Sequence, residues 1–84
     1  MANVVIYTKN YCPFSKDLKI FLEEKNVEFT ELMIQDDDNL RREMEEKSGG
    51  RKDTPQVFIN SSHIGSFDDL KALESIGKLE ELLK

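Results

Sequence analysis

Residues 8–15 read TKNYCPFS and contain the only cysteine of the chain, Cys12. A short apolar run precedes this stretch and an amphipathic pattern follows it, so Cys12 is predicted to lie where a strand ends and a helix begins. Pro13 suits the first turn of a helix, because its missing N–H breaks no hydrogen bond there. The free N–H groups and the positive end of the helix dipole favour a thiolate at Cys12, and Lys9 adds a positive charge nearby. The stretch therefore predicts a reactive thiol instead of a buried, inert one.

The composition predicts one small domain that spans residues 1–84. A single cysteine cannot form an internal disulfide, which is typical of a protein from a reducing compartment. The sequence does not start with a basic region and a long apolar run, and no segment approaches the roughly 18 apolar residues of a membrane span. We therefore expect a cytoplasmic monomer without a secretory signal or a membrane anchor. The net charge of −5 argues against general binding to nucleic acid.

The spacing of apolar residues predicts the order βαβαββα with a short final helix. Strands are expected at residues 4–7, 27–34, 56–59 and 63–64, and helices after Cys12, over residues 40–47, after Ser66 and near residues 79–83. The apolar stripe expected to bury the first helix consists of Phe14, Leu18, Phe21 and Leu22, and that of the third helix consists of Leu70, Leu73 and Ile76. The acidic segment at residues 35–39 is predicted to cap the second helix, in preference to binding a metal ion.

The stretch CPFS at residues 12–15 resembles the active site of glutaredoxins, which usually reads Cys-Pro-Tyr-Cys or Cys-Pro-Phe-Cys. The predicted order of elements agrees with the fold of that family along the whole chain. The resemblance implies an α/β protein of the thioredoxin-like fold, with a four-stranded mixed sheet flanked by helices. It also implies a redox enzyme, a glutathione-disulfide oxidoreductase, in which Cys12 is the catalytic residue.

A glutathione site built from separate stretches is also implied by this resemblance. Thr54-Pro55 matches the place where glutaredoxins carry a cis proline, which would turn the backbone of Thr54 toward the cysteine of glutathione. The segment GSFDD at residues 65–69 resembles the Gly-Gly-Cys-Asp-Asp segment that holds the γ-glutamyl end, where a helix N-terminus binds a carboxylate and an aspartate binds the ammonium group. Lys9, with Arg51 or Lys52, would hold the glycine carboxylate. The implied glutathione-binding residues are Lys9, Tyr11, Thr54, Pro55, Ser66, Phe67, Asp68 and Asp69.

The residues alone leave alternatives open at this site. Pro55 also fits the start of a strand, and Asp68 and Asp69 also fit a helix cap without any ligand. Asp53 stands where relatives often carry threonine, and it would place a negative charge near the ligand. His63, the only histidine, is expected to be structural, and one cysteine with one histidine falls short of a zinc site, so no metal is expected.

Ser15 stands where two-cysteine relatives carry their second cysteine, so the resemblance implies a monothiol mechanism. Cys12 would attack a glutathionylated protein or a small mixed disulfide, and a second glutathione would regenerate the thiolate. The alternative is a glutathione-ligated iron–sulfur carrier, a role of monothiol glutaredoxins that usually read Cys-Gly-Phe-Ser. Pro13 in place of that glycine, and the absence of extra residues before Cys12, favour the enzyme.

Overall fold

The computed structural model describes residues 2–84, so Met1, the first residue of the predicted domain, lies outside the described residues. The elements are β1 (Val4–Thr8), α1 (Pro13–Glu24), β2 (Thr30–Met33), α2 (Asp38–Lys47), β3 (Gln56–Ile59), β4 (Ser62–Gly65), α3 (Phe67–Ser75) and α4 (Leu79–Leu83). The predicted order βαβαββα with a short final helix is confirmed. No helix in this part of the chain is long and apolar enough to cross a membrane.

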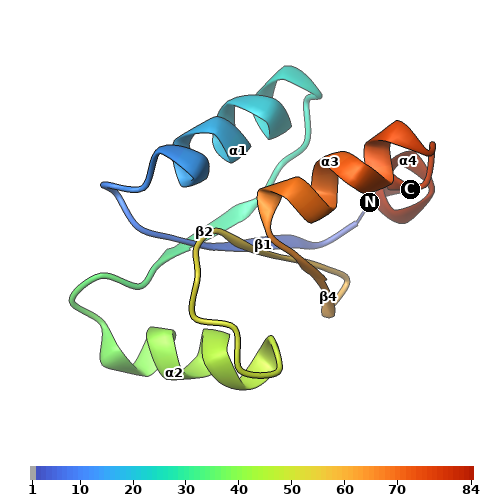
Figure 1. Cartoon of the computed structure of the whole chain (residues 1–84). Coiled ribbons are helices and arrows are strands. Elements are labelled where there is room, and N and C mark those ends of the chain that lie inside the picture. Colours follow the sequence, from blue (N-terminus) through green and yellow to red (C-terminus); the bar gives the residue numbers. More distant parts are fainter. Residues whose placement is uncertain (1) are drawn as a thin grey trace.

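The strands form a four-stranded mixed sheet in the order β2-β1-β3-β4. β1 pairs with β2 in parallel and with β3 antiparallel, and β4 forms an antiparallel hairpin with β3. Figure 1 shows α1 and α3 on one face of the sheet and α2 on the other. The predicted architecture is therefore confirmed, and the central strands β1 and β3 are almost wholly buried, as the apolar runs at residues 4–7 and 57–59 indicate.

Apolar side chains form a core on each face of the sheet. The larger core lies under α1, α3 and α4 and includes Ile6, Leu18, Leu22, Val57, Leu70 and Leu79. The smaller core lies under α2 and consists of Tyr7, Ile34, Met44 and Phe58. Each fully buried side chain of this kind stabilises the fold by roughly 1.5–3 kcal/mol. The cores fix α1 and α3 on the same face of the sheet, which brings their N-terminal ends into reach of one another.

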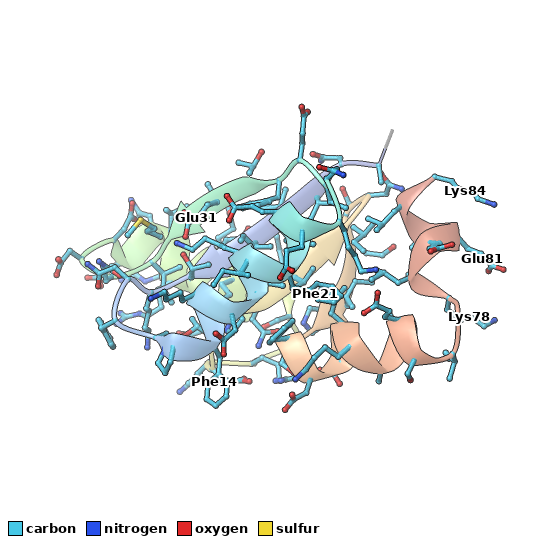
Figure 2. The ribbon with its side chains drawn as sticks, turned by 90° about the horizontal axis from the view of Figure 1, so that it is seen from above. Phe14, Phe21, Glu31, Lys78, Glu81 and Lys84 are labelled. Carbon is cyan, nitrogen blue, oxygen red and sulfur yellow. The ribbon has the colours of Figure 1, made fainter. Side chains whose placement is uncertain are left out.

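The first turn of α1 differs from the sequence prediction. Phe14 is 60% exposed, and Ser15 is only 1% exposed. The buried positions of α1 are Ser15, Leu18 and Leu22, whose i, i+3, i+7 spacing defines one helix face. Phe14 lies beside this face at the end of the helix, and Figure 2 shows its ring projecting outward from the start of α1. The prediction that Phe14 is a core residue is therefore wrong.

The C-terminal end of α3 gives a second correction. Ile76, which its spacing assigned to the core, is 66% exposed. The helix ends at Ser75, with Ile76 as its C-cap, and Gly77 turns the chain with a φ of 76°. Because Ile76 has already left the helix, its side chain no longer follows the buried stripe.

Two smaller expectations concern the segment before α2. β2 covers Thr30–Met33 and is shorter than the predicted strand at residues 27–34, although Val27 and Phe29 still pack against the larger core. Asp37 caps α2, because its side chain accepts a hydrogen bond of 3.0 Å from the N–H of Leu40. The predicted capping role of the acidic segment is therefore confirmed.

Candidate active site

Cys12 occupies the N-cap of α1, immediately after the loop that leaves β1. Its N–H donates to the carbonyl of Lys9 at 3.2 Å, and its own carbonyl accepts from the N–H of Lys16 at 3.3 Å. Its side chain makes no capping hydrogen bond, so the half-buried sulfur lies at the open N-terminal end of the helix. This is the position predicted from sequence, where helix N–H groups and the dipole favour negative charge.

The pKa of the Cys12 thiol is lowered from its ordinary value. Partial burial raises this pKa, but the thiolate is stabilised by hydrogen bonds from the side chains of Thr54 and Ser15 and from the N–H groups of Ser15 and Phe14, and these outweigh burial. The thiol proton is directed at the carbonyl oxygen of Thr54, 3.6 Å from the sulfur. Only the neutral thiol can donate to that carbonyl. When Cys12 ionises, the sulfur loses this one weak hydrogen bond and accepts several others.

Lys9, which we expected to lower this pKa as well, is not needed to explain the shift, because the hydrogen bonds account for it. Its ammonium group lies 5.8 Å from the centre of the Tyr11 ring, a cation–π arrangement. Lys9 and Tyr11 line a hollow of about 390 Å³ together with Asn10, Ile34, Gln35, Asp36, Asp38 and Arg41. The charge of Lys9 is therefore available to a ligand in this hollow.

A separate cleft of about 230 Å³ lies between the start of α1, the start of α3 and the segment that precedes β3. Its lining residues are Phe14, Asp53, Thr54, Pro55, Ser66, Phe67 and Asp68. The structure thus brings together Thr54, Pro55 and the first residues of α3, as the sequence predicted, and the Thr54-Pro55 bond is cis. Phe14 is the lining residue that sequence reasoning missed, because its helical spacing suggested a core position.

The start of α3 is a complete capping box. The Ser66 hydroxyl accepts from the N–H of Asp69, and the Asp69 carboxylate accepts from the N–H of Ser66 at 2.8 Å and from its hydroxyl at 3.0 Å. These bonds to the Ser66 backbone and side chain lower the pKa of Asp69. Gly65 has a φ of 121°, and a Cβ there would clash with the Asp69 carboxylate, so the position favours glycine. The carboxylate of Asp69 is thereby engaged in the cap.

Asp68 has a different environment from its neighbour. Its side chain is 87% exposed and lines the cleft, with the Lys71 ammonium 3.5 Å from its carboxylate. An exposed surface ion pair of this kind is weak, so the Asp68 carboxylate can exchange Lys71 for a cationic group of a ligand. The same Lys71 also lies 4.5 Å above the ring of Phe67, which forms an apolar part of the cleft.

Arg51 neutralises the negative charge that Asp53 brings to the cleft. Its Nε and Nη2 donate to the two carboxylate oxygens of Asp53 at 2.9 and 2.8 Å, and its Nη1 lies 3.8 Å from Asp69. The hydrogen bonds from Arg51 lower the pKa of Asp53. Arg51 is thus paired inside the chain, whereas sequence reasoning placed it or Lys52 on the ligand. Over residues 2–84, no group of three or more His, Cys, Asp or Glu side chains is arranged to hold a metal ion.

Comparisons of the sequence and of the structure with known proteins point to the same family. The glutaredoxin family model matches residues 4–64. Glutaredoxin 3 of Escherichia coli (strain K12) is 49% identical over 84 residues, which are 100% of both chains. The solution structure of a glutaredoxin from Brucella melitensis is 48% identical, with a TM-score of 0.85 over 100% of this chain and 90% of that chain.

The fold is also shared with a more distant protein. A buckwheat glutaredoxin, solved as a complex with glutathione, has a TM-score of 0.87 over 98% of this chain and 76% of that chain, at 21% identity. The thioredoxin-like fold predicted from sequence is therefore confirmed by these solved structures.

Proposed function

The chain belongs to the glutaredoxin family, and from this premise we propose its specific activity, the reduction of mixed disulfides of glutathione. Family and fold give it the role of a thiol–disulfide oxidoreductase, and glutaredoxins generally use glutathione as a co-substrate. Within that role, the chain reduces mixed disulfides of glutathione through Cys12 alone. The observation that carries this proposal is the Cys12 sulfur with its lowered pKa, 3.6 Å from the Thr54 carbonyl at the edge of the cleft.

Glutathione would lie extended across the cleft. The N–H and C=O of Thr54 pair with its cysteine residue as one strand pairs with another, beside Pro55. The free N–H groups at the start of α3, around Ser66 and Phe67, receive the γ-glutamyl carboxylate, and Asp68 receives the ammonium group. The glycine carboxylate lies on the other side of Cys12, toward Lys9 and Tyr11.

The reaction needs one protein cysteine. The Cys12 thiolate attacks the glutathione sulfur of the mixed disulfide, the old S–S bond breaks, and the substrate leaves as a thiolate that takes a proton from water. The thiolate of a second glutathione then attacks the sulfur of the glutathione bound to Cys12. Cys12 leaves as a thiolate and oxidised glutathione is released. One free glutathione is consumed for each substrate thiol released, and the other half of the oxidised glutathione comes from the substrate. The low pKa of Cys12 makes it a good leaving group in this last step.

The proposal extends to substrates and location. Ser15 cannot form an internal disulfide, so the mixed disulfide with glutathione persists until glutathione resolves it. The substrates are then glutathionylated proteins and small mixed disulfides, in preference to protein disulfides that require two thiols. We place the protein as a monomer in the cytoplasm, where glutathione is abundant and reduced.

A coupled assay tests this function. Turnover of a glutathionylated peptide is followed with NADPH and glutathione reductase, and Cys12→Ser serves as the inactive control. We expect turnover that requires glutathione, disappears in the control, and is accompanied by a wild-type adduct of one glutathione in mass spectrometry. Release of glutathione from the peptide, followed by mass spectrometry, at the same rate with a glutathione-free thiol would contradict the proposal, and so would absence of the adduct.

A further inference from the structure

Gln56 is a fully buried polar residue that the proposed reaction does not use. It is the first residue of β3 and is 0% exposed. A buried amide is costly unless its donors and acceptors have partners. Its Nε2 donates to the carbonyl of Asp53 at 2.9 Å, and its Oε1 lies 2.7 Å from the Nε2 of His63. Gln56 therefore joins the segment before Pro55 to strand β4.

The orientation of the Gln56 amide is determined by its partners. The carbonyl of Asp53 can only accept a hydrogen bond, so the NH₂ group of Gln56 must face it. The Oε1 of Gln56 is left facing His63, whose Nε2 must then carry a proton and donate. A reversed amide would place two oxygen atoms against each other at Asp53, so Asp53 selects the orientation of the amide and the tautomer of His63 follows from it.

This orientation fixes the peptide unit that the cleft exposes. The bond between Asp53 and Thr54 is trans, and in a trans peptide the C=O and N–H groups point in opposite directions. Gln56 draws the C=O of Asp53 toward the buried start of β3. The N–H of Thr54 belongs to the same peptide unit, so it points away from Gln56, and both Asp53 and Thr54 line the cleft.

We propose that Gln56 is a positioning residue for glutathione, which locks the Asp53–Thr54 peptide so that the Thr54 N–H faces the ligand, and that His63 holds Gln56 in place. This inference rests on the function proposed above. His63 suits the role because its ring also packs on Phe58, 5.0 Å between ring centres, which holds it on β4. A freely rotating peptide would present the N–H of Thr54 to the ligand for only part of the time and would weaken binding.

Variants at these positions separate positioning from general stability. Gln56→Met keeps a similar volume but cannot donate to Asp53, and His63→Phe keeps a ring on Phe58 but loses the donor. Tyr7→Phe is the matched control, because it removes a hydrogen bond from a buried residue to Glu43 on the α2 side of the sheet, outside the cleft. Each variant is measured for kcat and KM with the glutathionylated peptide, for the rate of Cys12 alkylation by iodoacetamide, and for thermal stability.

We expect Gln56→Met to raise KM about three- to tenfold, the effect of one net hydrogen bond, with kcat and the alkylation rate within about twofold of wild type. His63→Phe should raise KM less, and Tyr7→Phe should lower the melting temperature without changing KM. An unchanged KM in Gln56→Met, or an equal rise in Tyr7→Phe, would overturn the inference. If Gln56→Met does not fold, the exposed position of His63 still allows the test, and an unchanged KM in His63→Phe would then refute it. A wild-type protein without glutathione-dependent turnover would refute the proposed function instead.

Discussion

Replacement of Ser15 by alanine should lower the reactivity of Cys12 and should change the stability of the protein in a direction that depends on pH. Ser15 is 1% exposed, and among the described residues its hydroxyl has no partner apart from the Cys12 sulfur. While Cys12 is a thiol, the buried hydroxyl is poorly satisfied, which costs free energy. When Cys12 ionises, the hydroxyl donates to the thiolate and lowers its pKa. Alanine removes both effects.

The magnitude follows from the type of hydrogen bond that is lost. A bond to a charged group contributes about 1.5–3 kcal/mol, and the partial exposure of Cys12 favours the low end of this range. One pKa unit corresponds to about 1.4 kcal/mol, so Ser15→Ala should raise the pKa of Cys12 by about one unit. For the thiol form, removal of the unsatisfied hydroxyl should leave the free energy of unfolding unchanged or raise it by up to about 1 kcal/mol.

The sign of the stability change depends on pH. The pKa of Cys12 is lower in the folded protein, so the stabilisation from its thiolate is fully present above the unfolded thiol pKa of about 8.5 and disappears as the pH falls through the folded pKa. Wild type should therefore be the more stable protein at alkaline pH, and Ser15→Ala should equal or exceed it in acid. Urea unfolding near pH 5 and pH 9 measures this crossover.

The pKa itself is measured from the alkylation rate of Cys12 against pH. Phe14→Ala is the control, because it keeps the backbone N–H at that position and should leave the midpoint of the alkylation profile unchanged. A midpoint in Ser15→Ala within about 0.3 units of wild type would show that the Ser15 hydroxyl does not stabilise the thiolate, and the reasoning would be refuted.

Other substitutions test the remaining contacts. Ser15→Cys should lose two hydrogens with oxidised glutathione in mass spectrometry, whereas wild type should gain one glutathione, because residues three apart on a helix share a face. Asp69→Ala should lower the free energy of unfolding by about 1 kcal/mol through loss of the cap. Its lowered pKa means that this difference is present above pH 3.9 or so and shrinks as the pH falls, which urea unfolding between pH 2 and pH 7 would show. Asp68→Asn should raise KM for glutathionylated peptide about threefold or more without a change in melting temperature. Protein purified without oxygen should be colourless, and a brown protein would favour the iron–sulfur carrier.

Most of the fold could be predicted from the sequence, because there the local pattern of apolar and capping residues agrees with the burial in the structure. The apolar run at the start of the chain becomes the central strand β1, and Asp69, which fits a helix cap by sequence, forms a capping box with Ser66. The spacing failed at Phe14 and Ile76, which lie at helix ends. Periodicity describes a continuous helix, but whether the first or last side chain meets the core depends on where the sheet beneath it stops.

For the site, the sequence indicated which residues lie there better than it indicated which residues they contact. Thr54, Pro55 and Asp68 lie in the cleft, but they were assigned through a family resemblance and not through their own chemistry. The pairing of Arg51 with Asp53 depends on loop geometry, which charge alone does not specify. Gln56 carried no signal, because a polar residue at the first position of a strand is ordinary until its burial is known.

The arrangement would explain how an acidic chain could bind the anionic tripeptide of the proposed function. Both Cys12 and Ser66 are N-caps, of α1 and α3, and the cleft lies between these two helix starts. Each helix N-terminus carries the equivalent of about half a positive charge from its backbone N–H groups. The cationic side chains at the cleft, Arg51 and Lys71, are already paired with carboxylates. Within the cleft, the field that favours a thiolate therefore comes mainly from the backbone, which the net charge of −5 does not reveal, and Lys9 adds its charge only in the neighbouring hollow.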